Sequence, residues 1–540
     1  MEDGFDLLIR GGQLIDGSGA AARTADVGVR GAEVAAVGDL AGVSAREVVS
    51  AEGRIVCPGF IDMHSHSDLV ILAQPDATSR IGQAITTEVV GNCGHSAAPR
   101  TDAFEAEFAA QRRGAPPEMD YRWHSVGEFL ERVSAARPAT NQAVLVGHGT
   151  VRVGAMGYAD RPATAAELAR MESLVAEAMA DGAFGLSSGL IYAPGAYAST
   201  DEVAALATAA ARAGGFYATH MRDEADGLFT ALDEALEIGR RAGLPVQVSH
   251  LKAAGRRQHG HVAVAVERIE KARREGVDAA ADFYPYEAGS TSLSALLPPW
   301  VLEGGVDRMV ERLGDADVRR KIAREIDAGL TGWWNPVGAM GGDWTTVLVT
   351  RVGSDRNRLL QGRRIGELAA ERDRDPVDMV ADLLCEERGS VQIVIFMMDS
   401  RDVATVASVP WVMMGTDGSA VSPAAAERQL VHPRTYGTTA RILRDYAGPG
   451  RAVTWEAAIH RMTALPAARL GLTDRGRLAA GMKADIAVLD PATLEDRATY
   501  ARPHVLPTGV DLVVVNGSVA LRGGAPTGAR AGVVLRRTAA

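Results

Sequence analysis

An alternation of apolar, strand-like runs with Ala-, Glu- and Arg-rich helical stretches constrains the fold of this chain most. The runs are continuously apolar, which is typical of parallel strands buried on both faces. Amphipathic helical stretches lie between several of them, for example at residues 163–181 and 224–242. Strand–helix units repeated in this way predict a (β/α)8 barrel in the α/β class. The predicted strands are RIVCPGFIDMH, AITTEVVGNC, QAVLVGHG, AFGLSSGL, FYATHM, PVQVSH, VDAAADFYPY and WVMMGTDG.

The two chain ends have a different pattern, with short β-rich runs separated by Gly and Asp turns. Neither end is long enough to close a barrel, so we expect residues 1–56 and 470–540 to form one composite β-sandwich domain. Residues 57–469 would then form the barrel. Within the long gap before the last predicted strand, residues 287–345 have weak periodicity and are consistent with a lid-like insertion. The run VQIVIFMM at 391–398 also has strand character and is an alternative for the eighth strand.

Composition and charge exclude several function classes. The chain has 540 residues and a net charge of −11, which gives no electrostatic reason to expect nucleic acid or an anionic membrane as a partner. The chain has three cysteines, and such a small and odd number argues against a disulfide framework. The acidic N-terminus has no signal-peptide pattern, and no apolar run is long enough to span a membrane. We therefore expect a cytoplasmic enzyme with a small-molecule substrate, whose oligomeric state the sequence does not reveal.

Two histidines follow the first predicted strand in the motif GFIDMHSHSD. Because side chains alternate along a strand, His64 and His66 point the same way, which at the carboxyl end of a barrel strand is toward the active-site mouth. Two converging imidazoles are a metal-binding arrangement. Taken alone, the motif is equally consistent with a pair of solvated loop histidines.

Four further groups end predicted strands at the same level of the barrel. His220 ends FYATH, His250 ends PVQVSH, Asp417 ends WVMMGTD, and Cys93 ends ITTEVVGNC. A single histidine at a strand end is more often structural, and a small buried cysteine is usually inert. A shared level for all of these groups instead indicates one or two metal sites, for which zinc is the natural ion.

These strand-end histidines, together with GFIDMHSHSD and GTDGS, resemble the amidohydrolase superfamily. Longer stretches resemble the D-aminoacylase family, the N-acyl-D-amino-acid deacylases, and the resemblance covers essentially the whole chain. The stretches that carry it are GNCGHSAAP, GAFGLSSGLIYAPG, YATHMRDE, QVSHLKAAG, DFYPYEAGSTSL and HPRTYGTTARILRDY.

The resemblance implies a barrel with a two-ended β-sandwich and a zinc-dependent active site. It implies one tightly held zinc on Cys93, His220 and His250. It also implies a weaker second site that uses His64, His66, the shared Cys93 and Asp417. Many relatives bridge two metals with a carboxylated lysine on strand four, but AFGLSSGL has no lysine, which supports Cys93 as the bridging group.

The implied activity is hydrolysis of N-acyl-D-amino acids to a carboxylate and a free D-amino acid. Asp417 matches the family position that takes a proton from water and delivers it to the leaving nitrogen, although TDGS is also good turn chemistry. Lys252, Tyr284 and Ser290 match family residues near the substrate carboxylate. Arg222 follows His220 by strand continuation and is a further candidate, with a surface Arg–Glu pair as the alternative.

Two departures and two alternatives remain open at the sequence level. Ser65 and Ser67 stand where family members often carry Thr and Asp, which puts the hydrogen bonding around the ligands in question. A cyclic amidase of the hydantoinase or dihydropyrimidinase kind would keep the metals and change the substrate. A metal-free scaffold protein is the non-enzymatic alternative. The D preference rests on the resemblance alone.

Overall fold

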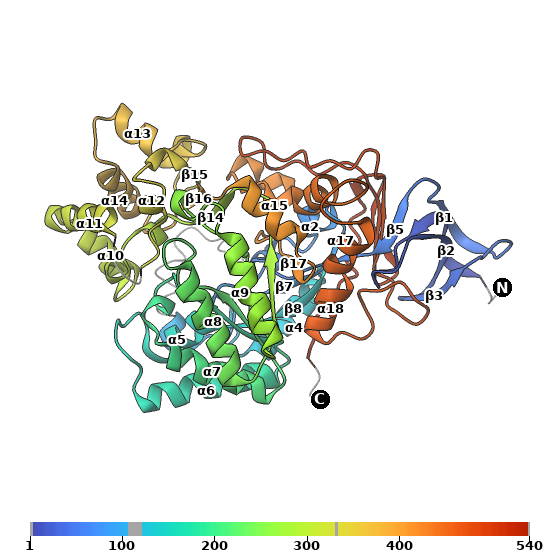
Figure 1. The fold of residues 1–540 in the computed structure, drawn as a ribbon, viewed down its shortest axis with the longest axis horizontal. Coiled ribbons are helices and arrows are strands. Elements are labelled where there is room, and N and C mark those ends of the chain that lie inside the picture. The colour runs from blue at the N-terminus through green and yellow to red at the C-terminus, as the bar shows by residue number, and fades with distance from the viewer. Residues whose placement is uncertain (1–3, 106–120, 330–332, 538–540) are drawn as a thin grey trace.

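The structure, a computed structural model, describes residues 4–105, 121–329 and 333–537. Residues 1–3, 106–120, 330–332 and 538–540 lie outside this description, and the predicted terminal domain and insertion extend into three of these segments. The described part is a mixed α/β protein with three regions (Figure 1). Sheet strands from the chain ends lie at one end of the molecule, and helices α10–α14 lie at the opposite end.

Strands from both chain ends share one nine-stranded sheet, with the order β21-β20-β19-β18-β5-β1-β2-β3 and with β4 paired to β1. The two ends meet where β5 pairs antiparallel with β18. Apolar residues from both, including Ile9, Val29, Ile486 and Val514, pack in one cluster. The strands are β1 (Phe5–Leu14), β2 (Arg23–Arg30), β3 (Glu33–Gly38), β4 (Ala45–Ser50), β5 (Ile55–Pro58), β18 (Ile486–Leu489), β19 (Val510–Val515), β20 (Ser518–Arg522) and β21 (Ala525–Pro526).

The middle of the chain supplies parallel strands in two runs, β6-β7-β8 and β9-β10-β11-β12-β13-β17. Only Leu145 separates β8 from β9. The backbone N–H of Met63, just after β6, donates to the C=O of Met414 in β17 at 3.1 Å. The strands are β6 (Phe60–Asp62), β7 (Ile85–Val90), β8 (Asn141–Val144), β9 (Val146–Gly147), β10 (Gly185–Gly189), β11 (Phe216–His220), β12 (Val246–Val248), β13 (Ala279–Phe283) and β17 (Val412–Met414).

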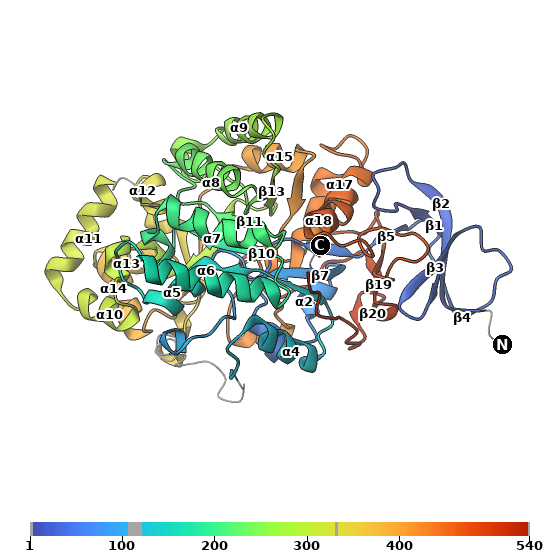
Figure 2. The same ribbon diagram turned by 90° about the horizontal axis from the view of Figure 1, so that it is seen from below.

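Amphipathic helices cover the outside of these strands (Figure 2). The predicted helices at 163–181 and 224–242 correspond to α6 and α8, and α6 begins at a capping box of Thr164 with Glu167. Helix α7 packs on β10 and β11. The helices of this region are α1 (Val70–Ala73), α2 (Thr78–Ile81), α4 (Val126–Ala136), α5 (His148–Met156), α6 (Ala165–Ala180), α7 (Thr200–Arg212), α8 (Leu228–Ala242), α9 (Val262–Arg274), α15 (Ser400–Ser408), α16 (Arg434–Arg441), α17 (Trp455–Met462) and α18 (Ala464–Leu470).

The segment between β13 and β17 contains a separate unit with its own apolar cluster, in which Trp333 and Trp334 are buried. The run VQIVIFMM contains β16, which lies in this unit's antiparallel sheet β14-β16-β15, so the strand beside β13 is β17. The unit extends well beyond residue 345. Its elements are β14 (Ala288–Ser292), β15 (Val347–Arg351), β16 (Gln392–Phe396), α10 (Val306–Leu313), α11 (Ala316–Ala328), α12 (Pro336–Ala339), α13 (Ile365–Glu371) and α14 (Pro376–Glu386).

Among the helices of the described residues, none has both the length and the apolarity that a membrane crossing requires.

Candidate metal centre

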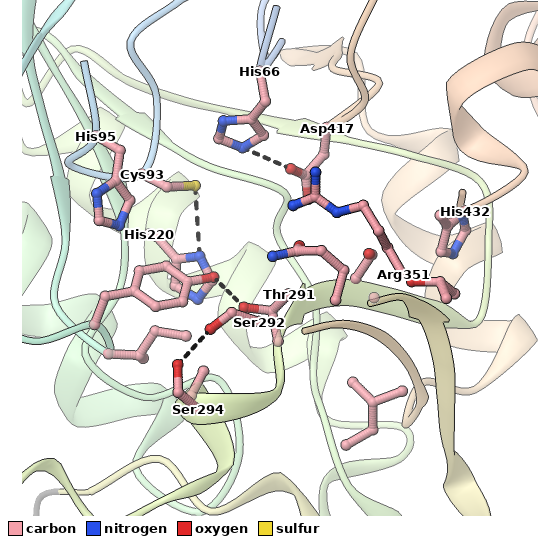
Figure 3. A pocket seen from close by; sticks show the side chains of 18 of the residues that line it. His66, Cys93, His95, His220, Thr291, Ser292, Ser294, Arg351, Asp417 and His432 are labelled. Atoms are coloured by element: carbon pink, nitrogen blue, oxygen red, sulfur yellow. Dashed lines mark hydrogen bonds and ion pairs between the residues drawn. The ribbon is translucent and has the colours of Figure 1, made fainter. Parts of the chain in front are cut away.

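The six predicted metal ligands converge at the carboxyl ends of the parallel strands. His64 and His66 follow β6, Cys93 follows β7, and His220 is the last residue of β11. His250 and Asp417 come soon after β12 and β17. A cavity of about 730 Å³ opens at this edge, and all of these residues except the fully buried His64 line it (Figure 3).

The first cluster of donors centres on the thiol of Cys93. Its Sγ lies 3.2 Å from Nε2 of His64, 3.6 Å from Nε2 of His250 and 3.7 Å from Nδ1 of His220. Burial raises the pKa of this thiol, but His64, His220 and His250 outweigh burial and hold the pKa well below its usual value. A thiolate among imidazoles is a donor set that zinc prefers.

A second cluster shares His64 with the first. Oδ1 of Asp417 lies 3.0 Å from Nε2 of His66 and 3.6 Å from Nε2 of His64. On the other side of the carboxylate, Nη1 of Arg434 lies 2.8 Å from Oδ2. Burial raises the pKa of Asp417, but Arg434, His64 and His66 outweigh it and keep this pKa well below the usual range. The two clusters together offer donors for two adjacent ions, and the residues present therefore fit zinc.

Three of the candidate ligands have left-handed backbone conformations, which are uncommon for residues other than glycine. The φ angles are 54° at Cys93, 35° at His250 and 50° at Asp417. Such strained conformations cluster at functional sites, where the surrounding structure enforces them. The backbone at three separate strand ends is thus bent to aim a donor at the same place.

The strand β10, which has no lysine, packs closely against the loop that carries Cys93. A Cβ atom at Gly189, the last residue of β10, would lie 2.1 Å from the carbonyl oxygen of Cys93. A Cβ atom at Gly94 would in turn lie 2.7 Å from the backbone nitrogen of Gly189. The loop after β7 therefore occupies the space beside the end of β10, and glycine at both positions permits this approach.

Ser65 and Ser67, the two departures from the family motif, share one buried carboxylate. Ser65 Oγ donates to Oε2 of Glu88 at 2.6 Å, and Ser67 Oγ donates to the same oxygen at 2.5 Å. Oε1 of Glu88 accepts hydrogen bonds from Thr140 and Gln142. The segment that carries His64 and His66 is thus fixed to β7 by the carboxylate of Glu88.

Asp282 on β13 fixes the two histidines whose Nε2 atoms face Cys93. Its Oδ1 accepts the backbone N–H of His250 at 2.7 Å and lies 3.3 Å from Nδ1 of His64. Its Oδ2 accepts Nε2 of Gln247 at 2.9 Å. A carboxylate behind a ligand histidine holds the orientation of the ring, as outer partners of metal sites commonly do.

Comparison with known proteins identifies the family of this chain. A sequence model described as the amidohydrolase family matches residues 47–521. A D-aminoacylase of Alcaligenes xylosoxydans xylosoxydans is 38% identical over 99% of this chain and 98% of its own length. The chain belongs to the D-aminoacylase family of amidohydrolases. Within this family, an N-acyl-D-glutamate deacylase of the same organism is 36% identical over 100% of this chain and 98% of its own.

Solved structures of the D-aminoacylase family have the same fold. A D-aminoacylase with a binuclear metal center has a TM-score of 0.80 at 36% identity, covering 99% of this chain and 100% of its own. An N-acyl-D-glutamate deacylase from Bordetella bronchiseptica, complexed with zinc and a phosphonate inhibitor, has a TM-score of 0.82 at 33% identity, with 99% and 100% coverage. A dihydropyrimidinase from Brevibacillus agri, at 15% identity and a TM-score of 0.55, shares the fold alone.

The three substrate-binding residues that the resemblance to the D-aminoacylase family implies all line the cavity. These are Lys252, Tyr284 and Ser290. Each already has a partner: Nζ of Lys252 donates to Glu224 at 2.6 Å, Ser290 Oγ donates to the C=O of Ile393 at 2.8 Å, and the ring of Tyr284 lies under the guanidinium of Arg434.

Arg222 is not among the residues that line the cavity, and its pairing with Glu234 matches the alternative of an Arg–Glu pair, so its role in substrate binding stays a prediction. Its guanidinium binds Glu234 and the carbonyl oxygens of Ala196 and Ala198. Strand β11 ends at His220, so the strand alternation that placed Arg222 beside that histidine no longer applies.

Other histidines divide between the cavity and the scaffold. His148 begins α5 and pairs its Nε2 with Glu202 at 2.9 Å, and it is not among the residues that line the cavity. His95 and His432 both line the cavity. His432 places its Nε2 2.8 Å from the C=O of Ala288, which ties the loop before α16 to β14.

Sequence reasoning missed the roles of Arg434 and Arg351 in this wall. Arg434 lies in HPRTYG, one of the quoted family stretches, so a signal was present. Arg351 ends β15 of the inserted unit and lines the cavity (Figure 3). Within the described residues it has no carboxylate partner, and its side chain is exposed. No local pattern in TTVLVTRVG signals this role.

Proposed function

We propose that this protein hydrolyses the amide bond of N-acyl-D-amino acids, giving a carboxylate and a free D-amino acid, with zinc as its metal. The observation that carries the proposal is the convergence of Cys93, four histidines and Asp417 at one edge of the parallel strands, where all but His64 line one cavity. The names of the relatives, which include deacylases for D-glutamate and D-aspartate derivatives, support the substrate class and the D preference.

The ligand sets are those that the family resemblance implies, and the two clusters support them. Cys93, His220 and His250 would hold the tight ion, and His64, His66 and Asp417, with Cys93 shared, would hold a weaker one. A bound zinc ion would lower the pKa of an attacking water and would polarise the amide carbonyl. His64 lies between the clusters, within 3.6 Å of both Cys93 and Asp417.

Asp417 moves the proton. Its Oδ1 faces the cavity beside His66, and its pairing with Arg434 keeps it ionised and able to accept a proton from the attacking water. As water oxygen bonds to the acyl carbon and the carbon–nitrogen bond breaks, Asp417 returns this proton to the leaving nitrogen. The departing D-amino acid then carries its amine out through the cavity.

The substrate carboxylate needs a cation in the cavity wall. Lys252 is neutralised by Glu224, and Arg434 is neutralised by Asp417. Arg351 is the lining arginine without a carboxylate partner in the part of the chain that the structure describes. Together with Tyr284 and Ser290, it supplies the positive and hydroxyl-rich surface that an N-acyl amino acid requires.

The finer architecture belongs to the same proposal. The backbone hydrogen bond between Met63 and Met414 supports closure of the parallel strands into a (β/α)8 barrel spanning residues 57–469. The apolar cluster shared by both chain ends supports a β-sandwich domain of residues 1–56 and 470–540. Leu297 and Trp334 line the cavity, which supports a lid role for the insertion at about 287–345.

A chiral product assay over N-acetyl D- and L-amino acids, with zinc counted on the same sample, tests the proposal. We expect release of free D-amino acids and none from the L series, with one to two zinc ions per chain. Ring opening of hydantoin without any cleavage of acyl-D-amino acids would refute the substrate class. A zinc-free protein inactive on both would point to a scaffold.

A further inference from the structure

Arg80 on helix α2 has no part in the proposed chemistry, although its side chain is completely buried beside the site. Its guanidinium reaches three separate elements. Nη1 lies 3.2 Å from Oδ2 of Asp62 at the end of β6, and it donates to Oγ1 of Thr416 at 2.6 Å. Nη2 donates to the C=O of Thr435 on helix α16. One buried cation thus joins the first parallel strand, the loop after β17 and α16.

The two neutral partners of Arg80 are next to the two members of another ion pair. Thr416 immediately precedes Asp417, and Thr435 immediately follows Arg434. Nη1 of Arg434 lies 2.8 Å from Oδ2 of Asp417. The backbone beside each member of this ion pair is therefore bound to the same guanidinium, which fixes the loop after β17 relative to α16.

The neighbours of Arg80 in the chain strengthen the same connection. Ser79 Oγ donates to the C=O of Ser419 at 3.1 Å and accepts the N–H of Val421 at 3.1 Å, farther along the loop after β17. Gln83, which follows α2, donates from Nε2 to the C=O of Thr435 at 2.8 Å. The segment around α2 therefore binds both the loop after β17 and the first turn of α16.

The loop after β17 also packs tightly on Arg80. A Cβ atom at Gly418 would lie 3.0 Å from Nη2 of Arg80 and 3.1 Å from Cα of Thr435. Because close-packed interiors transmit small displacements, loss of the guanidinium should shift the backbone next to Asp417.

We infer that Arg80 is a positioning residue for proton transfer: its forked guanidinium holds Asp417 and Arg434 in the alignment in which Asp417 takes a proton from water and returns it to the leaving nitrogen. The inference rests on the proposed function, because it takes Asp417 as the proton carrier. Alignment matters at this step because a displacement of about 1 Å can cost about 100-fold in rate. Arg80 acts through its neighbours, since it is not among the residues that line the cavity.

A role in folding alone is the alternative, because breaking a buried ion pair destabilises a protein wherever the pair lies. A second mutation separates the two roles. If Arg80 acts through Asp417, its replacement should cost little more once Asp417 can no longer carry a proton. If Arg80 only stabilises the fold, its replacement should lower kcat equally in both backgrounds.

The test is a double-mutant cycle of Arg80→Lys and Asp417→Asn, with Arg461→Lys as the matched control. Lysine keeps a positive charge beside the buried Asp62, but its compact ammonium group lacks the fork that binds two elements at once. Arg461 is also buried, and it donates to two backbone C=O groups at the opposite end of β17 from Asp417. Steady-state kinetics, Tm and zinc affinity by chelator competition are measured on each variant.

We expect Arg80→Lys to lower kcat on an N-acetyl-D-amino acid by about 10- to 100-fold, with little change in KM. Its affinity for the tight zinc ion should equal that of wild type, because the proposed ligands of that ion follow β7, β11 and β12, which Arg80 does not join. In the Asp417→Asn background, the same replacement should change kcat by less than about twofold. Arg461→Lys should keep the wild-type kcat, even if its Tm falls as far as that of Arg80→Lys.

The inference would be overturned by wild-type kcat in Arg80→Lys, or by an equal loss of kcat in both backgrounds. If Arg80→Lys does not fold, Thr416→Val provides a second cycle, because it removes the acceptor beside Asp417 and leaves all charges in place. The same non-additive loss of kcat is expected from it, and an additive loss would overturn the inference. A wild type that binds zinc but cleaves no N-acyl-D-amino acid would instead refute the proposed function, and the inference with it.

Discussion

Asp417 has two candidate roles. It is a candidate metal ligand, and it is also the residue that we propose to carry the proton. Its two oxygens are differently engaged, with His66 and His64 near Oδ1 and Arg434 at Oδ2. The tight cluster around Cys93 does not include it. Proton transfer and tight metal binding should therefore be separable by mutation.

Replacement Asp417→Asn tests this separation. We expect the tight zinc to remain and kcat to fall by about 10²- to 10⁴-fold, because the amide cannot accept the proton from water. Steady-state kinetics and zinc analysis on the same preparation measure both quantities. Turnover close to wild type would remove Asp417 from the mechanism.

Binding of the substrate carboxylate by Arg351 can be tested with Arg222 as the matched control. Replacement Arg351→Met should raise KM for N-acetyl-D-amino acids by about tenfold or more, because an unscreened cation leaves the cavity wall. Replacement Arg222→Met should leave KM unchanged, since Arg222 binds Glu234 outside the cavity. Equal KM values for wild type and Arg351→Met would return the anchoring role to Lys252.

Protons compete with zinc at the histidines of the metal-free site. Burial alone would lower the pKa of each ring, but Asp417 raises the pKa of His66 to about 9, and Glu224 raises that of His220 to about 9. Both are therefore protonated at neutral pH and must lose a proton to bind zinc. We expect zinc affinity to rise about tenfold or more per pH unit up to about pH 9, measured by chelator competition. An affinity independent of pH would contradict these protonation states.

At the scale of elements, the site depends on close contacts between the ends of neighbouring strands. Gly189, the last residue of β10, packs against the carbonyl group of Cys93. Glu88 on β7 binds the segment of Ser65 and Ser67 by hydrogen bonds. Asp62, at the end of β6, accepts the backbone N–H of Thr416 at 2.8 Å and so joins the first strand to the loop of Asp417. These contacts keep donors from separate strands within reach of one another.

Replacement Gly189→Ala tests the approach of β10 to the cysteine loop. The added methyl group would meet the backbone oxygen of Cys93 at 2.1 Å, so the loop must move. We expect a loss of about 1–3 kcal/mol in stability and weaker zinc binding, because the displaced thiolate no longer faces both histidines. Thermal unfolding with and without zinc measures the two effects. Unchanged zinc affinity would show that the loop tolerates the shift without moving Cys93.

Across the whole molecule, the proposed metal centre would join loops from five parallel strands, so its ion should stabilise the entire fold. A ligand that binds only the folded state adds RT ln(1 + [L]/Kd) to stability, about 4 kcal/mol at a thousandfold excess over Kd. Chelation of zinc should therefore lower Tm, and zinc added back should restore it. Calorimetry measures this; equal Tm values for the metal-free and zinc-loaded forms would show that the ion contributes nothing to folding.

The residues of the candidate site differ in how well the sequence alone could predict their positions. His64, His220 and His250 were predictable because a strand's end and its side-chain alternation are local properties. Cys93 was predicted as a ligand only through the family resemblance, since a small cysteine after an apolar run is usually core. Arg222 was expected at the cavity because the alternation was carried past the end of β11, and the structure pairs it with Glu234 instead.

The sequence by itself determined the family, the alternation of strands and helices, and the strand-end donors, because periodicity, turn chemistry and short motifs are written in neighbouring residues. Only the tertiary structure decided that Arg351 from the insertion lines the cavity, that Glu224 lies behind two histidines, and that Glu88 binds both serines. These contacts join residues far apart in the chain, and their partners are chosen by packing, which no local pattern records.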